Sequence, residues 1–208
     1  MAKPLLVGVA GGTSAGKSTF ALRVAETVGV ENAILLAESS YYHDRSHFAE
    51  SAGEINFDHP DSIDFDLMER HLGMLIEGKA IPRLVYHRDT CVREETVETI
   101  EPRRVVLVEG ILILAEQKIR DLLDFKVFID ADSDLRFIRR LGRDFAEKSM
   151  DLEEICDVYL TKVKPMHLLF VLPSKRYADV IVPMGGLNLA ALEMVISRIQ
   201  AALATEDR

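Results

Sequence analysis

LLVGVAGGTSAGKST, the sequence of residues 5–19, decides the fold of this 208-residue chain. Its first six residues are mostly apolar and predict a buried strand, and residues 11–18 follow the spacing G-x-x-x-x-G-K-S/T of a phosphate-binding loop. A helix is predicted from Lys17, because apolar residues recur at helical spacing until Gly29 ends the pattern. Strand, loop and helix in this order are the context in which the motif binds phosphates. We therefore expect the chain to bind ATP, with GTP as the alternative.

The nucleotide phosphates are expected to lie against the loop itself, which consists of Gly11, Gly12, Thr13, Ser14, Ala15, Gly16, Lys17, Ser18 and Thr19. Glycines let the backbone curl so that its N–H groups point at phosphate oxygens, and the following helix adds the positive end of its dipole. Lys17 can reach the outer phosphates, and the Ser18 hydroxyl can bind Mg²⁺.

The composition argues against several classes of protein. Lys and Arg number 25 against 34 Asp and Glu, so the net charge of −9 gives no general attraction to nucleic acid or to an anionic membrane. Cys91 and Cys156 form neither a disulfide framework nor a metal-ligand spacing. No secretory signal is visible, and the apolar run at residues 105–115 is too short to span a bilayer. We expect a cytoplasmic protein with one domain, residues 1–208, and without a nucleic-acid or membrane partner.

Apolar runs alternate with segments of helical periodicity along the chain. This alternation predicts an α/β fold with a parallel five-stranded sheet and helices on both faces. Strands are expected at residues 5–10, 33–37, 104–108, 126–130 and 179–182, and helices at 17–28, 61–78, 119–123, 133–148, 152–163 and 188–203. Asp61 or Ser62 is expected to cap the second helix, and Pro165 to end the fifth. Residues 81–100 are predicted to form a small β-excursion of two short strands.

Glu109 is the candidate metal-binding acid. It follows the apolar strand predicted at residues 104–108, so it lies at the sheet edge beside the phosphate-binding loop. An acidic residue there can hold Mg²⁺ directly or through water, and the alternative is an acid in a strand-end turn. The metal role is favoured by analogy with the general layout of phosphate-loop proteins.

A second group of candidate residues is a row of arginines on one predicted helix. Arg136, Arg140 and Arg143 recur at helical spacing with Arg139 beside them, and the apolar residues of this helix fall on its other side. Such a row is either a solvated face or a lid, at about residues 140–152, that places arginines on phosphates. The lid is favoured, because the chain is otherwise acidic and phosphoryl transfer depends on cations around the moving group.

Residues 56–61, with the sequence NFDHPD, are the third candidate. Carboxylates accept hydrogen bonds from neighbouring hydroxyls, so this segment suits a sugar. A turn followed by a helix cap explains the same residues equally well.

These segments together resemble the uridine–cytidine kinase family, within the phosphoribulokinase/uridine kinase group of P-loop kinases. The resemblance covers nearly the whole chain and is carried by GVAGGTSAGKST, INFDHPDSIDFD, VVLVEGIL, LDFKVFIDADSDLRFIRRLGRD, YLTKVKPMHLLFVLPSKRYADVIVP and GGLN. The FDHPD and VKP…KRYADVIVP stretches are specific to this family, whereas the phosphate-binding loop is not. The resemblance implies a P-loop NTPase-type fold and transfer of the ATP γ-phosphate, with Mg²⁺, to the 5′-hydroxyl of a pyrimidine nucleoside.

The resemblance also implies roles for single residues. Lys17 and Arg143 would stabilise the moving phosphoryl group, and the Ser18 hydroxyl and the strand-end carboxylate named above would serve Mg²⁺. Asp58 would hold ribose hydroxyls, and Arg140 would be a second active-site arginine of the lid. Lys148 falls where the family usually carries a lid arginine. Family members are often tetramers, which implies a homo-oligomer, tetramer or dimer.

One departure from the family concerns the catalytic base. The family usually carries an aspartate at the end of the second strand, which orients and deprotonates the attacking hydroxyl. Aligning the tyrosines at residues 41–42 puts Ser39 there, and losing a general base typically costs ~10²–10⁴-fold in rate. Glu38 could substitute only if the backbone shifts, because neighbouring side chains on an extended segment point to opposite sides. His43 and Asp44 are the other candidates.

Further departures fall where the nucleoside base is expected. Tyr86 and Arg93 match the family and are expected to contact the acceptor. His87 replaces an aspartate, Cys91 replaces a base-contacting His or Tyr, and Met150 replaces a positive charge of the lid. The donor side of the site therefore matches the family, and the acceptor side departs from it.

The sequence thus favours a Mg²⁺-dependent ATP phosphotransferase that acts on uridine, cytidine or a related small alcohol. The alternative is a non-catalytic or weakly active nucleotide-binding protein on the same fold, because Ser39 replaces the usual catalytic aspartate.

Overall fold

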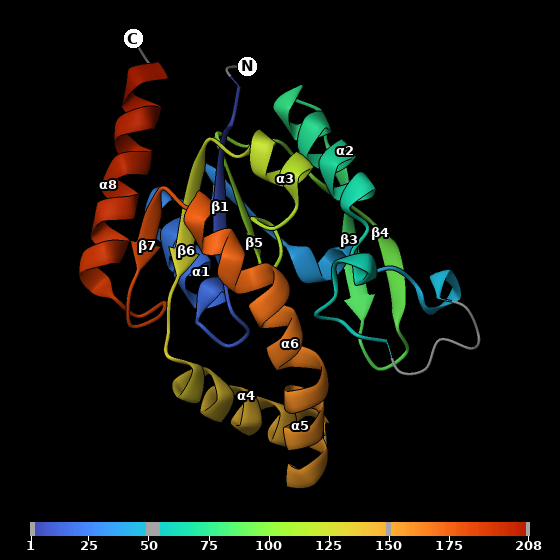
Figure 1. The fold of residues 1–208 in the computed structure, drawn as a ribbon. Helices are drawn as coiled ribbons and strands as arrows, with labels where there is room; N and C mark the ends of the chain where they lie inside the picture. The colour runs from blue at the N-terminus through green and yellow to red at the C-terminus, as the bar shows by residue number, and fades with distance from the viewer. Residues whose placement is uncertain (1–2, 49–54, 149–150, 207–208) are drawn as a thin grey trace.

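Five parallel strands form the central sheet in the order β2-β5-β1-β6-β7 (Figure 1). The computed structural model describes residues 3–48, 55–148 and 151–206. The strands are β1 (Leu5–Gly11), β2 (Ala33–Ala37), β5 (Val105–Gly110), β6 (Phe125–Ile129) and β7 (Val180–Val182). Nearly every residue of β1 and β5 is buried, as expected for strands covered on both faces. The predicted α/β fold with a parallel five-stranded sheet is confirmed.

Helices pack on both faces of this sheet (Figure 1). Helices α1 (Lys17–Val28) and α8 (Leu189–Glu206) cover one face, where Phe20, Val24 and Ile199 join the buried side chains of β1 and β6. Helices α2 (Phe65–Ile76) and α3 (Gln117–Leu122) cover the other. None of the helices in the described part of the chain is both long and apolar enough to cross a membrane.

A two-stranded antiparallel hairpin, β3 (Ile81–His87) and β4 (Val92–Ile100), lies beside the main sheet (Figure 1). This is the predicted β-excursion. The cap predicted for the preceding helix is wrong, because residues 60–62 form a separate 3₁₀ turn and α2 begins only at Phe65. Asp64 is its cap, and its carboxylate accepts the Leu67 N–H at 2.9 Å.

A continuous helical segment over residues 152–177 follows α4 (Ser133–Lys148) and rises from the bottom of Figure 1 to the middle of the molecule. It consists of α5 (Leu152–Val158), η4 (Tyr159–Val163), α6 (Lys164–Met166), η5 (His167–Val171), α7 (Leu172–Ser174) and η6 (Lys175–Tyr177).

The expectation that Pro165 ends this helix is wrong. A wide π turn precedes the proline, and the N–H of Lys164 bonds the carbonyl of Tyr159, five residues back. The same arrangement precedes Pro173, where the N–H of Leu172 bonds the carbonyl of His167. Because each π turn widens the backbone before the proline, it gives room to a ring that would clash in an α-helix.

Candidate active site

The loop between β1 and α1 has the backbone shape of a phosphate cradle. Gly11, Ser14 and Gly16 have φ values of 148°, 57° and 97°, and the carbonyl of Gly12 accepts the N–H of Ala15 at 3.1 Å. The loop before α8 packs directly on it, since a Cβ on Gly186 would lie 2.0 Å from the Gly16 carbonyl oxygen. The conformation of the phosphate-binding loop is therefore fixed both by its own turn and by contact with the loop before α8.

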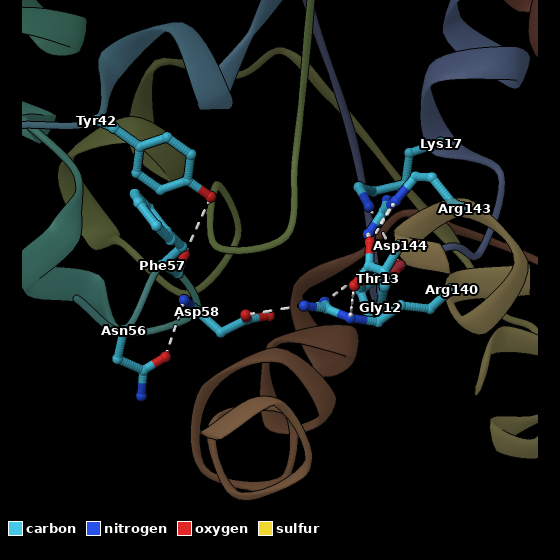
Figure 2. A network of polar contacts seen from close by, with 10 residues as sticks. All are labelled: Gly12, Thr13, Lys17, Tyr42, Asn56, Phe57, Asp58, Arg140, Arg143 and Asp144. Atoms are coloured by element: carbon cyan, nitrogen blue, oxygen red, sulfur yellow. Dashed lines mark hydrogen bonds and ion pairs between the residues drawn. The ribbon is translucent and has the colours of Figure 1, made fainter. Parts of the chain in front are cut away.

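Lys17 is buried inside this cradle. Its Nζ donates to the carbonyl of Gly12 at 3.1 Å (Figure 2). Burial lowers the pKa of Lys17, and the carboxylates of Glu109, Glu38 and Asp58 act in the opposite direction. The ammonium group thus lies among three acids, at the position where the outer phosphates of a nucleotide would meet the loop.

Ser18 and Glu109, the two residues predicted to serve a metal, meet in the structure. The Ser18 hydroxyl donates to Oε1 of Glu109 at 2.8 Å. They come from the first turn of α1 and the carboxyl end of β5, and β5 pairs with β1 in register. Hydroxyl and carboxylate oxygens are ligands that Mg²⁺ takes in company with phosphate oxygens and water. This pair therefore fits a Mg²⁺ ion bound together with a nucleotide.

Glu38 is a buried acid, 3% exposed, at the carboxyl end of β2. Its carboxylate accepts the N–H groups of Ile111 at 3.2 Å and Leu112 at 2.8 Å. Gly110 makes room for it, since a Cβ there would lie 2.3 Å from Glu38 Oε2. Burial raises the pKa of Glu38 to about 7, although the N–H of Leu112 and the charge of Lys17 favour the ionised form.

The backbone around Ser39 differs from the sequence expectation. Residues Glu38–Tyr41 form a 3₁₀ turn, η1, and not an extended segment. Successive side chains on such a turn are about 120° apart, and not on opposite sides as they are on a strand. Glu38 and Ser39 accordingly line the same cavity, and the expectation that only a backbone shift could bring Glu38 there is wrong.

The arginines predicted to form a lid are held by a single carboxylate. Asp144, which is 1% exposed, accepts Nε and Nη2 of Arg143 at 3.0 Å each through Oδ1. Through Oδ2 it pairs with Nε of Arg140, also at 3.0 Å. Arg140 then donates from Nη1 to the Thr13 hydroxyl at 3.1 Å (Figure 2). The helix α4 is thereby connected to the phosphate-binding loop.

Asp58 faces the same arginine from the opposite side (Figure 2). Its Oδ2 lies 3.9 Å from Nη1 of Arg140, and its carboxylate is 13% exposed. Its backbone N–H bonds Oδ1 of Asn56 at 3.1 Å, which fixes the loop before α2. A carboxylate beside an arginine that bonds the phosphate-binding loop suits the hydroxyls of a small acceptor.

Three aromatic rings stand beyond Asp58. The ring of Tyr42 lies 4.9 Å from that of Phe57 and 5.1 Å from that of Tyr86, measured between centroids. The Tyr42 hydroxyl donates to the Phe57 carbonyl at 3.0 Å (Figure 2). The guanidinium of Arg88 lies over Tyr42 and Phe57, at 5.4 and 5.9 Å from their centroids.

Residues from each of these groups border one cavity of about 1610 Å³. The phosphate-binding loop and α4 form one end, and Tyr42, Phe57, Arg88 and Cys91 form the other. Glu38, Ser39 and Asp58 lie between them. The cavity lies at the carboxyl ends of β1, β2 and β5, which is where ligands bind in open α/β sheets.

Comparison with known proteins places this geometry in a family. The sequence profile described as the phosphoribulokinase / uridine kinase family matches residues 6–191. The chain belongs to this family. A uridine kinase of Chloroflexus aggregans is 48% identical over 201 residues, which cover 96% of each chain. A uridine kinase of Alkaliphilus metalliredigens is 40% identical over 204 residues, which cover 98% of each chain.

Solved structures share the fold at much lower identity. Phosphoribulokinase from Rhodobacter spheroides has a TM-score of 0.64 at 15% identity, covering 87% of this chain and 70% of its own. A possible uridine kinase from Bacillus stearothermophilus has a TM-score of 0.57 at 18% identity, covering 88% and 90%. These likenesses establish the fold of the family, and the chemistry is argued from the site.

Some residues that the family resemblance singled out lie outside the cavity lining. The side chains of Tyr86 and Arg93 are not among the described residues that border the cavity. Tyr86 packs behind Tyr42 and Phe57, and Arg93 pairs with Asp64 at 3.0 Å and donates to the Tyr42 carbonyl at 3.4 Å. Both therefore support the aromatic end from behind. Lys148 is the last residue of α4, and its side chain lies outside the described part of this family member.

The structure gives Asp144 and Arg136 contacts that were not predicted from the sequence. The ion pair of Asp144 with Arg140 could have been predicted from the sequence, because Asp144 lies four residues after Arg140 on the same helix. Arg136 had been taken only as part of the basic row, but its guanidinium packs on Gly12, where a Cβ would lie 2.6 Å from Nη1.

Arg136 in turn contacts His167, with Nη2 3.2 Å from Nε2. Burial, and then the charge of Arg136, lower the pKa of His167 to about 4. The neutral ring can therefore accept from the guanidinium and support the phosphate-binding loop from the helix η5. No signal in the sequence pointed to this contact.

Proposed function

We propose that this protein transfers the γ-phosphate of ATP to the 5′-hydroxyl of a pyrimidine nucleoside, with uridine as the favoured acceptor. The main support is a single cavity that leads from a phosphate-binding loop, past a carboxylate suited to sugar hydroxyls, to an aromatic end suited to a base. Relatives that are 40% and 48% identical over nearly the whole chain are named uridine kinase.

On the donor side, the loop of residues 11–19 would bind the phosphates of ATP through its N–H groups. Ser18 and Glu109 would hold Mg²⁺, which when bound neutralises charge on the phosphates. Lys17 would contact the outer phosphates, and Arg143 the transferred phosphoryl group. Arg140 already bonds Thr13 of the loop, so little rearrangement separates it from a bound phosphate.

On the acceptor side, Asp58 would accept hydrogen bonds from the ribose hydroxyls and so orient the 5′-hydroxyl towards the phosphates. Glu38 would take the proton of that hydroxyl, directly or through one water. Its pKa of about 7 matches this task, because a general base works best when its pKa lies near the working pH. Ser39, beside it on the cavity wall, would orient the hydroxyl without taking its proton.

A second function competes with this one: a nucleotide-binding protein without phosphotransferase activity. Ser39 favours it, because serine stands where the family usually carries its catalytic aspartate. The position of Glu38 in the cavity argues for activity, since it supplies an alternative base. By resemblance we also propose a homo-oligomer, tetramer or dimer, which sedimentation velocity would test.

A turnover assay separates the two functions. The protein is incubated with ATP, Mg²⁺ and a panel of nucleosides, ribosides and small alcohols, and products are identified by mass spectrometry. Formation of uridine or cytidine monophosphate that is lost in Lys17→Ala supports the kinase. The matched control is Lys79→Ala, which removes an exposed lysine paired with Glu77. Binding of ATP without product from any acceptor would overturn the kinase and support the second function.

A further inference from the structure

Arg88 is a charged residue at the acceptor end of the cavity whose role the proposed reaction does not explain. It lies in the turn between β3 and β4. Cys91 closes this turn in a left-handed conformation, φ 57°, and its thiol donates to the Arg88 carbonyl at 3.5 Å. The turn thereby places both residues on the cavity wall.

The neighbours of the Arg88 guanidinium fix its position without using its hydrogen bonds. It lies 5.4 Å from the Tyr42 ring centroid and 5.9 Å from that of Phe57, which holds it by cation–π attraction. Within the described part of the chain, no carboxylate lies within salt-bridge distance of it. None of the described residues, the neighbouring Tyr42 hydroxyl included, accepts a hydrogen bond from the guanidinium. The donors of Arg88 are thus available to a ligand.

Other polar groups at this end of the cavity also offer donors. Oδ1 of Asn56 accepts the N–H of Asp58, which leaves the amide N–H groups of Asn56 for a ligand. The described residues named at this end include no acid, and Asp58, which lies between the two ends of the cavity, is 3.9 Å from Arg140. A ligand whose part farthest from the phosphate-binding loop carries hydrogen-bond donors would therefore meet few acceptors at the aromatic end of the cavity.

We propose that Arg88 contacts position 4 of the acceptor's base and makes the protein select uridine over cytidine. This inference rests on the proposed function. A guanidinium carries donors and no acceptor. The two bases differ at N3, which donates in uracil and accepts in cytosine, and at position 4, where uracil presents the O4 carbonyl, an acceptor, and cytosine the N4 amino group, a donor. At position 4, Arg88 can donate to O4 of uracil, whereas it meets a second donor in the N4 amino group of cytosine.

The test measures binding and turnover of both nucleosides with the full-length protein. Dissociation constants for uridine and cytidine are measured by calorimetry with a non-hydrolysable ATP analogue and Mg²⁺ present, and kcat/KM is measured with ATP. Three variants are compared with the wild type: Arg88→Gln, Arg88→Lys and Arg83→Gln. Arg83 is the matched control, because it lies on the same hairpin, is exposed and pairs with Glu98 at 3.0 Å.

We expect the wild type to bind uridine about tenfold more tightly than cytidine, as for one hydrogen bond to a charged group. Arg88→Lys keeps a preference for uridine, because an ammonium group also only donates. In Arg88→Gln the preference falls below about threefold, because the amide can rotate to offer an acceptor to cytosine. Arg83→Gln leaves the preference unchanged.

Equal binding of the two nucleosides by the wild type, or an unchanged preference in Arg88→Gln, would overturn the inference. Failure of the proposed function looks different. Uridine-selective binding that depends on Arg88 but yields no uridine monophosphate would refute phosphotransfer and retain the inference. Efficient phosphorylation of both nucleosides at equal kcat/KM would refute the inference about Arg88 and support the proposed function. Binding of neither nucleoside would overturn the inference, and the wider acceptor panel would then decide the function.

Discussion

Replacing Asp144 by asparagine tests whether one buried carboxylate positions both arginines at the phosphate site. Asp144 accepts two N–H bonds of 3.0 Å from Arg143, pairs with Nε of Arg140 at 3.0 Å and is 1% exposed. Asparagine keeps the size of the side chain but removes its charge and turns an N–H₂ group towards one of the guanidiniums. The variant therefore leaves two neighbouring cations without their shared counter-charge.

The expected loss of stability follows from these contacts. Removing one partner of a buried ion pair costs about 3–5 kcal/mol. The Arg143 side chain is 37% exposed, so water screens part of this loss, and we expect about 2–4 kcal/mol. For a chain of this size that corresponds to a fall in Tm of roughly 5–15 °C. In turnover, a displacement of about 1 Å at the arginines is expected to reduce kcat about 10²-fold.

The assay combines thermal unfolding with steady-state kinetics at 20 °C or below, where the variant stays folded. We expect kcat to fall while KM for ATP changes by less than about threefold, because Lys17 and the loop still bind the nucleotide. Asp134→Asn is the matched control, since Asp134 is an exposed acid on the same helix whose one bond to another described residue is with the neighbouring Leu135 N–H, at 2.9 Å. If Asp144→Asn keeps wild-type kcat and Tm, Asp144 does not position the arginines.

Three further predictions concern single residues. Burial raises the pKa of Glu38 from 4.5 to about 7, so kcat/KM should rise with pH around 7 as the carboxylate ionises and can act as a base. Glu38→Gln should abolish this rise and lower the rate ~10²–10⁴-fold. The raised pKa means that the folded state binds this proton more tightly, so the contribution of Glu38 to stability falls between about pH 4.5 and 7, and unfolding curves of Glu38→Gln should lack that decline. Glu109→Gln should raise the Mg²⁺ concentration for half-maximal rate at least about tenfold; an unchanged Mg²⁺ titration would exclude Glu109 as a ligand. Gly186→Ala should lower both Tm and ATP affinity, because its Cβ would lie 2.0 Å from the Gly16 carbonyl oxygen. The control is Gly73→Ala in α2, whose Cβ meets no atom within 4 Å and which should stabilise the helix by up to about 1 kcal/mol. Equal Tm values for the two variants would contradict the steric argument.

Features that are determined by residues close together in the chain could be predicted from the sequence. The loop motif and the strand and helix around it could be predicted, because a phosphate cradle needs a fixed order of glycines, lysine and hydroxyl over a few residues. The parallel sheet followed from the alternation of strands and helices. Ser18 and Glu109 were expected to meet because neighbouring parallel strands end at one edge.

Long-range contacts decided the rest, because their partners are far apart in the chain. Whether Glu38 enters the cavity depended on a 3₁₀ turn and on two N–H groups more than 70 residues away. Pro165 was expected to end a helix, because no local signal indicates that a π turn will make room for the ring.

The sequence by itself determined that this protein has a P-loop fold with a phosphate site and a metal-type pair of ligands. Only the tertiary structure decided that Asp144 holds both arginines at the phosphate end. It also decided how the opposite half of the site is built, with Arg93 behind the cavity wall and Arg88 lining it. The physical reason is the range of the interactions. A phosphate cradle is made by consecutive N–H groups, whereas the acceptor end is made by side chains from a loop, a hairpin and a helix that meet only after folding.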